Sequence, residues 1–577
     1  MEHIVGIDLG TTNSEITCIM DSKVTVVTQH DDGIMPSCVG LDDSGNLIVG
    51  REAKNQAAVF PDRTVSSIKR LMGTDTHVSL GGKEYTPQEI SALILKTLKQ
   101  RAEAFSGKPV QKAVITVPAY FTDSQRKATR EAGSIAGLDV VRIINEPTAA
   151  ALAYEHEDHS GQTILVFDLG GGTFDVSIVR IENSVVEVLA STGDNHLGGD
   201  DFDNKLADLF AKKIQEESSV DVKQNRVSMA RLVNEAEKAK IELTSRPFAQ
   251  VEIDHIAEKN GTPVHFSFAL ARDYFEELIT DDIDKTMNSV NRALEDAAIL
   301  PSAINRIILV GGSTRMPMIS RMLHEKFNLE PHGEIDPDLC VSIGAGIQAG
   351  REMGVATSSV LIDITPYTFG TSAFGVLNGM PSPDMYVPII RRNSKLPVSK
   401  TEVFYTMVDF QDGVDLKVYQ GENPDAGENL LIGDYHFKLS GKQPCHSTVT
   451  LRYDLDINGI LKIESIESNS GKKLEVTIEN AFEESSVEAV SFSKTKLEAL
   501  WQDDEEEDHQ TGVSSEVPKH ILDLIDLASS KLDIAPPDDR DTIVNLIEDI
   551  RLSVKENDLD RVEELTRELD DILFYID

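Results

Sequence analysis

Three consecutive glycines lie between two apolar runs in the segment FDLGGGTFDVSIV, residues 167–179, with an aspartate on either side. Glycine lets another group approach the backbone closely, so a glycine-rich turn between strands suits a bound phosphate, whose oxygens need several N–H donors. The alternative is a tight hairpin in which Gly170, Gly171 and Gly172 serve geometry only, because turns are where glycine concentrates. This segment alone leaves both interpretations open.

The same plan of strand, Asp-Leu-Gly, turn and strand occurs about 160 residues earlier, in VGIDLGTTNSEIT at residues 5–17. Two such loops in duplicated halves would face each other across a cleft. Backbone N–H groups and the hydroxyls of Thr11, Thr12 and Thr173 would then hold a polyphosphate from both sides. The paired loops therefore favour a nucleotide site over two unrelated hairpins.

Two aspartates, Asp8 and Asp168, would flank that polyphosphate. Carboxylates are repelled by phosphates unless a cation lies between them. Mg²⁺ fits this position because it keeps most of its waters and takes few protein ligands. Phosphoryl transfer to water further needs charge neutralisation and a positioned water, for which Lys69, Glu146 and Asp175 are candidates. A surface lysine and a helix-capping glutamate are the commoner roles of those residue types.

A third glycine turn follows a strand in RIILVGGSTRMPMISRMLHEKF, residues 306–327, where Pro317 suits the first turn of a helix. Free N–H groups at that helix start would attract an anion or the polar face of a nucleotide. The alternative is an ordinary short strand-to-helix connection. Neither GxxxxGK[ST] nor GxGxxG after a first strand is present, so a nucleotide fold here is of another type.

Composition limits the class of protein. A chain of 577 residues predicts three or four structural units. The net charge of -42 makes nucleic acid and anionic membranes unlikely partners. Four widely separated cysteines, without CxxC or zinc spacing, indicate reduced thiols and a cytoplasmic location. A strand at the very start, and no apolar run near eighteen residues, predict neither export nor a membrane span.

The periodicity changes twice along the chain. Residues 1–355 alternate strands and helices, with a β-α-β unit between residues 112 and 145, and predict an α/β domain. Residues 356–364 form a linker that is unusually apolar, and residues 365–482 alternate with period two, which predicts an antiparallel β domain. Residues 483–577 show helical spacing around an acidic run and predict a small helical unit.

Two dipeptides, Asp412-Gly413 and Asn458-Gly459, favour tight hairpin turns and are predicted to join strands of the β domain.

Read in order, the segments IDLGTTNS, VITVPAYFTDSQRKAT, RIINEPTAAALAY, FDLGGGTFD, LGGDDFD, EKAKIELTS and ILVGGSTRMP resemble the DnaK-type (seventy-kilodalton) heat-shock chaperone family. The resemblance covers nearly all of residues 1–480, and some segments look most like the HscC-like bacterial branch. It implies a multidomain fold: a two-lobed, duplicated actin-like ATPase domain, an antiparallel β-sandwich that binds peptide, and a short α-helical lid.

The resemblance also implies roles for residues of the ATPase domain. Lys69, Glu146, Asp168, Thr173 and Asp175 would be catalytic, and Asp8 and Asp168 would hold Mg²⁺ through water. The residues that would contact ATP or ADP are Gly10, Thr11, Thr12, Asn13, Gly170, Gly171, Gly172, Thr173, Gly198, Gly199, Glu237, Lys240, Thr244, Gly311, Gly312, Ser313, Arg315 and Asp338. Where many relatives have an arginine that stacks on adenine, this sequence has Ile241.

Further positions are implied for peptide binding and interdomain coupling. The peptide channel would be lined by Thr371, Ala373, Phe374, Phe404, Val414, Leu416 and Ile460. Thr371 replaces an aliphatic residue and Phe374 is bulkier than usual, so peptide preference should differ, toward smaller or more polar centres. Coupling would involve Pro118, Arg126, Val360, Leu361, Ile362 and Asp363, with the linker docked in ATP and released in ADP.

Three functions compete for these residues. The first is an ATP-driven chaperone of the stress-response type, which binds unfolded polypeptides and works with a J-domain partner; a nucleotide-exchange factor is a further candidate partner. The second is a small-molecule kinase of the actin and sugar-kinase superfamily, and the third is a filament-forming actin relative. Neither alternative has a use for the apolar linker and the β domain, so the chaperone is the favoured interpretation.

Overall fold

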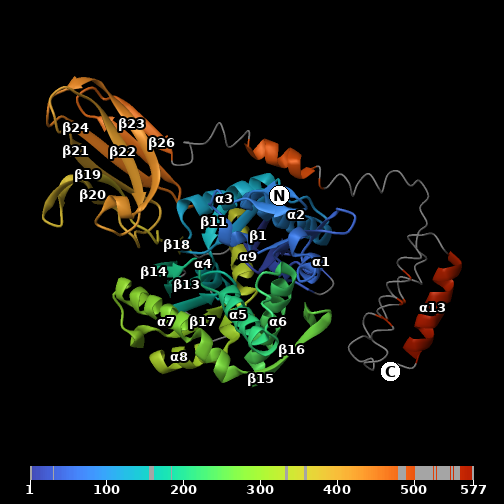
Figure 1. Ribbon diagram of the computed structural model, residues 1–577. Helices are drawn as coiled ribbons and strands as arrows, with labels where there is room; N and C mark the ends of the chain where they lie inside the picture. Colours follow the sequence, from blue (N-terminus) through green and yellow to red (C-terminus); the bar gives the residue numbers. More distant parts are fainter. Residues whose placement is uncertain are drawn as a thin grey trace. The chain divides into compact units, whose positions relative to one another are not determined.

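The structure is a computed structural model. It describes residues 3–29, 32–154, 161–183, 185–331, 335–355, 360–477, 489–498, 500, 524, 528, 543, 546, 550 and 559–574. The chain divides into two compact units, Met1–Leu500 and Trp501–Asp577, and each is described by itself. All of the sheets described below belong to the first unit (Figure 1).

The first large sheet contains the strand that opens the chain. Its strands are β1 (Ile4–Leu9), β2 (Asn13–Met20), β3 (Lys23–Val26), β4 (Met35–Pro36), β10 (Lys112–Val117) and β11 (Asp139–Asn145). The strand order is β11-β10-β1-β2-β3, with β4 on β2. β1 and β2 form an antiparallel hairpin, whereas β10 and β11 are parallel and are joined through helix α3 (Asp123–Ile135). The predicted β-α-β unit is therefore confirmed.

The second large sheet repeats this plan. Its strands are β12 (Gln162–Leu169), β13 (Phe174–Glu182), β14 (Val185–Asp194), β17 (Arg306–Val310) and β18 (Val360–Ile362), in the order β17-β12-β13-β14-β18. β12 and β13 form an antiparallel hairpin, and β12 also pairs parallel with β17, as β1 does with β10. The apolar linker supplies β18, which pairs parallel with the edge strand β14.

Helices cover both sheets. The longer ones are α2 (Pro87–Ser106), α4 (Glu146–Ala153), α5 (Gly199–Ser218), α6 (Arg226–Ser245), α7 (Arg272–Asp296), α8 (Pro317–Phe327) and α9 (Cys340–Glu352). α4 and α9 pack together so tightly that a Cβ on Gly344 would lie 1.8 Å from the carbonyl oxygen of Ala149. One buried cluster joins these two helices to both sheets, from Ile4 and Val114 to Val166 and Ile308.

Smaller elements surround this core. They are α1 (Arg51–Gln56), β5 (Cys38–Leu41), β6 (Leu47–Val49), β7 (Thr64–Ser66), β8 (Val78–Leu80), β9 (Lys83–Tyr85), β15 (Phe248–Lys259) and β16 (Thr262–Ala271), with short 3-10 turns η1 (Pro61–Arg63), η2 (Ile68–Leu71), η3 (Pro301–Ala303) and η4 (Gly312–Arg315).

The next region is a sandwich of two antiparallel sheets. Their orders are β20-β19-β22-β23 and β21-β24-β25-β26. The strands are β19 (Phe369–Leu377), β20 (Met380–Ile390), β21 (Val398–Tyr405), β22 (Gln411–Gln420), β23 (Leu430–Gln443), β24 (Thr448–Leu455), β25 (Leu461–Glu467) and β26 (Lys473–Thr477), with a 3-10 turn η5 (Ala426–Glu428). Leu416 and Val418 from one sheet and Tyr453 and Ile463 from the other share one buried core.

The two hairpin dipeptides have different outcomes. Asn458-Gly459 lies between β24 and β25, with Gly459 at φ 82°, as predicted. The prediction for Asp412-Gly413 is wrong, because this dipeptide lies inside β22, where the register with β23 shifts between Gln411 and Gly413. The pairing of β22 with a long neighbouring strand has overridden the local turn preference.

The described part of the second unit is helical. α13 (Leu559–Phe574) carries Val562, Leu565 and Leu569 into a buried cluster with Ile543 and Ile550. The acidic run at residues 503–508 and Pro536-Pro537 lie outside the described residues. The predicted fold class, an α/β region followed by antiparallel sheets and then by helices, is confirmed.

Candidate active site

A cavity of about 310 Å³ lies between the two large sheets and the helices beside them. Many of the residues proposed for nucleotide binding line it: Asp8, Gly10, Thr11, Thr12, Asn13, Lys69, Glu146, Asp168, Gly170, Gly171, Thr173, Glu237, Lys240, Thr244, Gly311, Gly312, Ser313, Arg315 and Asp338. Its lining comes from both hairpins, from α6 and from the turn before α8. Segments more than 300 residues apart in the sequence thus meet around one space.

The two hairpin loops on this cavity have the same length. Leu9 pairs with Ser14 across the first hairpin, and Leu169 pairs with Phe174 across the second. A Cβ on Gly171 would lie 1.8 Å from Oγ1 of Thr12, a distance that no real pair of atoms shows. None of Gly170, Gly171 and Gly172 has a positive φ. Gly171 and Gly172 are required because the facing loop comes so close, and a tight turn does not explain them.

An ion pair lies at the base of the cavity. Nζ of Lys69 is 2.5 Å from Oε1 of Glu146, and both residues are buried. Burial lowers the pKa of Lys69, but the carboxylates of Glu146 and Asp8 outweigh that effect, and its pKa is raised. Lys69 therefore carries a full positive charge into the cavity, where a phosphate would meet it.

The two aspartates proposed for Mg²⁺ are also buried on the lining. Burial and the carboxylate of Glu146 raise the pKa of Asp8 to about 7, and Thr116 donates a hydrogen bond of 2.6 Å to it. Burial, Glu146 and Asp175 also raise the pKa of Asp168. These crowded carboxylates would be stabilised by a cation.

Among the described residues, no three His, Cys, Asp or Glu side chains converge closely enough to hold a metal ion by themselves. This donor set fits a hydrated Mg²⁺ that takes its remaining ligands from phosphates.

The opposite end of the cavity is less acidic. Lys240 is fixed by Asp203, at 2.6 Å, and by the carbonyl oxygen of Gly199, at 3.1 Å. The Arg315 guanidinium bonds to Asp336 and Asp338, at 2.7 and 2.9 Å.

Between these anchored cations, Ile241 lines the cavity and is 58% exposed. An apolar side chain and a fixed guanidinium together suit a flat aromatic base.

Four of the proposed residues are not on the described lining. They are Gly172, Gly198, Gly199 and Asp175. Gly199 and the next residue donate backbone hydrogen bonds to the carbonyls of Gly170 and Gly171, so this segment supports the second loop from behind. Asp175 is buried and accepts a hydrogen bond of 3.1 Å from the backbone N–H of Tyr120.

Sequence reasoning missed several lining residues, which are Glu15, Val310, Met316, Pro337 and Val341. The four apolar ones show no distinguishing pattern. The sequence did contain an indication for Glu15, because it is an acidic residue within an apolar strand and is paired with Asp8 in the hairpin.

The residues proposed for coupling form a connected network. Arg126 donates to Oδ1 of Asn145, at 2.6 Å, and Nδ2 of Asn145 donates to both oxygens of Asp363, at 3.1 Å. Pro118 follows β10, directly before the turn that Arg126 contacts through the carbonyl of Ala119. The linker therefore contacts the end of β11 as well as β14, and it reaches Arg126 of α3 through Asn145.

The proposed peptide-channel residues lie on β19, β21, β22 and the turn before β25. Leu416 and Phe404 pack in the sandwich core, and the hydroxyl of Thr371 is satisfied by the carbonyl of Lys417. Phe374 is 55% exposed, and Ala373, Val414 and Ile460 are half-buried.

Comparison with known proteins bears on what this arrangement does. The family model described as "Hsp70 protein" matches residues 4–80 and 74–576. The chain belongs to the Hsp70 family. The Hsp70 chain is 42% identical to "Chaperone protein DnaK" of Thermotoga neapolitana over 587 aligned positions, covering 98% of this chain and 95% of the relative. It is 41% identical to the DnaK protein of Thermosipho africanus, with 99% and 95% covered.

Membership of the Hsp70 family decides among the three functions. The chain is an ATP-dependent chaperone with ATPase activity, and it is not a small-molecule kinase. The family binds nucleotide, and the cavity described above is the candidate site. The resemblance to the HscC-like branch stays a prediction, because both relatives named here are DnaK proteins. Among the described residues of this Hsp70 protein, no helix is long and apolar enough to cross a membrane.

Proposed function

We propose that this Hsp70 protein binds exposed apolar segments of unfolded polypeptides in its β-sandwich and that ATP controls their release. Hydrolysis would close the sandwich and lid on the peptide, and ADP release with ATP rebinding would open them. The observation that supports this cycle most directly is the cavity: two loops from duplicated sheets face each other across it, with the buried Lys69–Glu146 pair at its base.

In this proposal the two loops hold the phosphates. Backbone N–H groups of Gly171 and Thr12, with the hydroxyls of Thr11 and Thr173, bind phosphate oxygens. Lys69 neutralises charge that develops on the γ-phosphate, and Glu146 keeps its ammonium in place. Asp8 and Asp168 would hold a hydrated Mg²⁺, which supplies further charge neutralisation between the carboxylates and the phosphates.

Recognition of the nucleoside would fall to the other end of the cavity. Glu237 and Lys240 would contact the ribose, and Ile241 and Arg315 would cover the two faces of the base. Lys54 forms an ion pair of 2.7 Å with Glu237, and this pair would hold Glu237 in place for the ribose.

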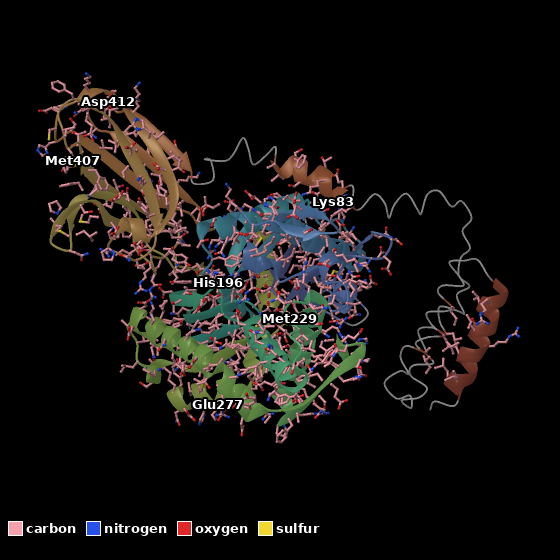
Figure 2. All side chains as sticks on the ribbon, in the orientation of Figure 1. Lys83, His196, Met229, Glu277, Met407 and Asp412 are labelled. Atoms are coloured by element: carbon pink, nitrogen blue, oxygen red, sulfur yellow. The ribbon has the colours of Figure 1, made fainter. Side chains whose placement is uncertain are left out.

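The sandwich would take the peptide as an extended strand, with backbone hydrogen bonds and one central apolar side chain. Its exposed apolar residues supply the contact surface: Phe374, Val376, Met380, Met407, Val408, Phe410, Leu430 and Leu431. Figure 2 shows Met407 and Asp412 near one end of the sandwich. Exposed apolar side chains in this number are expected of a domain that binds apolar segments.

The linker would carry the signal between the two sites. β18 adds a strand to the second large sheet at β14, and Asp363 accepts a hydrogen bond from Asn145 of the first large sheet. The chain segment that leads into the sandwich is therefore held by both sheets of the ATPase region. Loss of those contacts on hydrolysis would release the sandwich. A J-domain protein and an exchange factor are the expected partners, and the four free cysteines fit a cytoplasmic location.

The test is ATP turnover by the full chain, with and without an unfolded apolar peptide and a J-domain protein from the same genome. Peptide and J-domain protein together should raise turnover. Lys69→Ala should lower kcat by more than about a hundredfold while ATP binding persists. Lys83→Ala is the matched control, because Lys83 is an exposed lysine of the same lobe (Figure 2). Turnover that neither peptide nor Lys69→Ala changes would refute the proposal.

A further inference from the structure

One acidic residue on the cavity has no place in the scheme above. Glu15 lies on β2, lines the cavity, and is only 2% exposed. Its carboxylate has no hydrogen bond or ion pair to any described residue. A buried carboxylate without a partner is costly, so its presence on a ligand cavity points to a missing partner.

The strand register places Glu15 beside Asp8. The two residues are directly opposite each other in the β1–β2 hairpin. Residues opposite each other in an antiparallel pair project on the same face, with Cβ atoms about 4.5–5.5 Å apart, and like charges there are destabilising. Two carboxylates therefore share one wall of the cavity.

The second hairpin provides an internal comparison. Asp168 and Asp175 are opposite each other in it, at the positions that correspond to Asp8 and Glu15. Asp175 accepts a hydrogen bond from the backbone of Tyr120 and is not on the described lining. The first hairpin offers Glu15 no such donor, so its partner must come from the cavity.

The charges around Glu15 are mostly negative. Asp8, Glu146 and Asp338 surround it, and Lys69, already paired with Glu146, is the neighbouring cation. A carboxylate that is buried directly opposite Asp8 and has no donor among the described residues carries an electrostatic penalty. A cation would remove that penalty. Since no three acidic side chains among the described residues converge, such an ion needs phosphate oxygens to complete its ligand set.

We propose that Glu15 is a cation-binding carboxylate, which together with Asp8 and the phosphates of a bound nucleotide forms a divalent-cation site. The inference rests on the proposed nucleotide function and extends it. A nucleotide with a cation gains an additional ligand from Glu15, whereas a nucleotide without a cation gains no contact from it. Nucleotide affinity therefore depends more steeply on the cation than it would with an uncharged residue at this position.

The experiment measures the dissociation constant of a fluorescent ADP analogue for the full-length protein, once with Mg²⁺ and once with EDTA. The decisive quantity is the ratio of the two constants, EDTA over Mg²⁺. Glu15→Gln should lower this ratio by about ten- to a hundredfold, the usual cost of removing a residue that supports a metal site. Most of the change should appear in Mg²⁺, where the variant binds ADP more weakly than the wild type does.

Two further variants separate charge from shape. Glu15→Asp keeps the carboxylate and should keep most of the cation dependence, even if it packs less well. Glu52→Gln removes an equal charge from an exposed position on α1 and should leave the ratio unchanged. Thermal unfolding of each variant verifies that it is folded.

The outcomes are distinguishable. If the wild type binds ADP and Glu15→Gln has the same ratio, the inference is wrong and Glu15 is neutral or irrelevant in the complex. If Glu15→Asp lowers the ratio of the two dissociation constants as much as Glu15→Gln does, the effect is one of packing and the inference is again wrong. If the wild type binds no ADP under either condition, the proposed function itself fails.

Discussion

The two hairpin loops of the nucleotide cavity share a backbone plan and differ in their side chains. The β1–β2 loop carries hydroxyls on Thr11 and Thr12, whereas the β12–β13 loop carries three glycines. A Cβ on Gly172 would lie 2.7 Å from Cγ2 of Thr11, and one on Gly171 would collide with Thr12. Because the threonine side chains fill the space between the loops, the facing residues of the second loop must be glycines. The duplicated halves are complementary, and neither loop can be understood without the loop that faces it.

The halves also differ in what they receive from the rest of the chain. The second sheet gains β18 from the linker at its β14 edge, and the second acidic pair gains a backbone donor from Tyr120. In the first hairpin, Glu15 has no partner among the described residues. The second half therefore gains a linker strand, and in the first half Glu15 remains available to a ligand.

The comparison of the loops is tested most severely by Gly171→Ala. Forcing a methyl group against Thr12 costs about 1–3 kcal/mol by overpacking, which corresponds to about a ten- to hundredfold weaker binding of ADP. Gly170→Ala should cause a much smaller loss, because its Cβ would have only an ordinary contact, 3.8 Å from the carbonyl of Thr173. Fluorescence titration with labelled ADP measures both. Equal losses would mean that the loops do not approach as closely as described.

β18 pairs with β14 of the second sheet, and within the described part of the chain the first sheet receives no linker strand. A substitution in β18 should therefore impair the coupling between peptide binding and ATP hydrolysis without stopping hydrolysis itself. Leu361 is half-buried against the cluster shared by both sheets, so Leu361→Asp loses about 0.8–1.5 kcal/mol of burial and shifts docking of the linker by about four- to tenfold. Basal ATP turnover should persist, and its stimulation by peptide should be lost.

Val360→Asp is the graded control for the linker, because Val360 is 58% exposed and should matter less. Stimulation that survives Leu361→Asp in full would remove β18 from the signal path.

The smallest predicted effect is on the pH dependence of thermal stability, through Asp175 of the second hairpin. Burial raises the pKa of Asp175 to about 7, so the folded state favours its protonated form. Its contribution to stability is fully present below the unfolded pKa, near 4, and is lost as pH rises through about 7. In the nucleotide-free protein, the first unfolding transition of the wild type should fall by a few degrees relative to that of Asp175→Asn between pH 5 and 8. Parallel profiles would contradict this assignment.

Much of this protein could be predicted from local sequence patterns. The hairpin loops at Gly10 and Gly170, the β-α-β unit and the antiparallel sheets follow from residue spacing, which reports directly on neighbours along the chain. The failure at Asp412-Gly413 has the opposite cause. Its preference for a turn is worth little against the hydrogen bonds that β22 forms with β23, and a strand partner is not visible in a dipeptide.

Most of the candidate site residues that a motif carried line the cavity, whereas lining residues outside the motifs were missed. Glu15 stood in the quoted hairpin, but its significance lies in its register with Asp8 and in the lack of a donor nearby. The pairing of Glu15 with Asp8 could have been predicted by counting the same number of residues away from the loop on both strands. The lack of a hydrogen-bond donor to Glu15 could not have been predicted, because it depends on which backbone segment packs against the strand.

The sequence by itself determined that two phosphate-type loops exist, which acids and hydroxyls they carry, and that an apolar linker separates an α/β region from a β region. Only the tertiary structure decided that Thr12 meets Gly171, that Lys69 pairs with Glu146, and that β18 completes the β14 edge. The physical reason is that chain spacing sets the local backbone and the face on which each side chain projects. Contacts between distant segments depend instead on how whole sheets and helices pack.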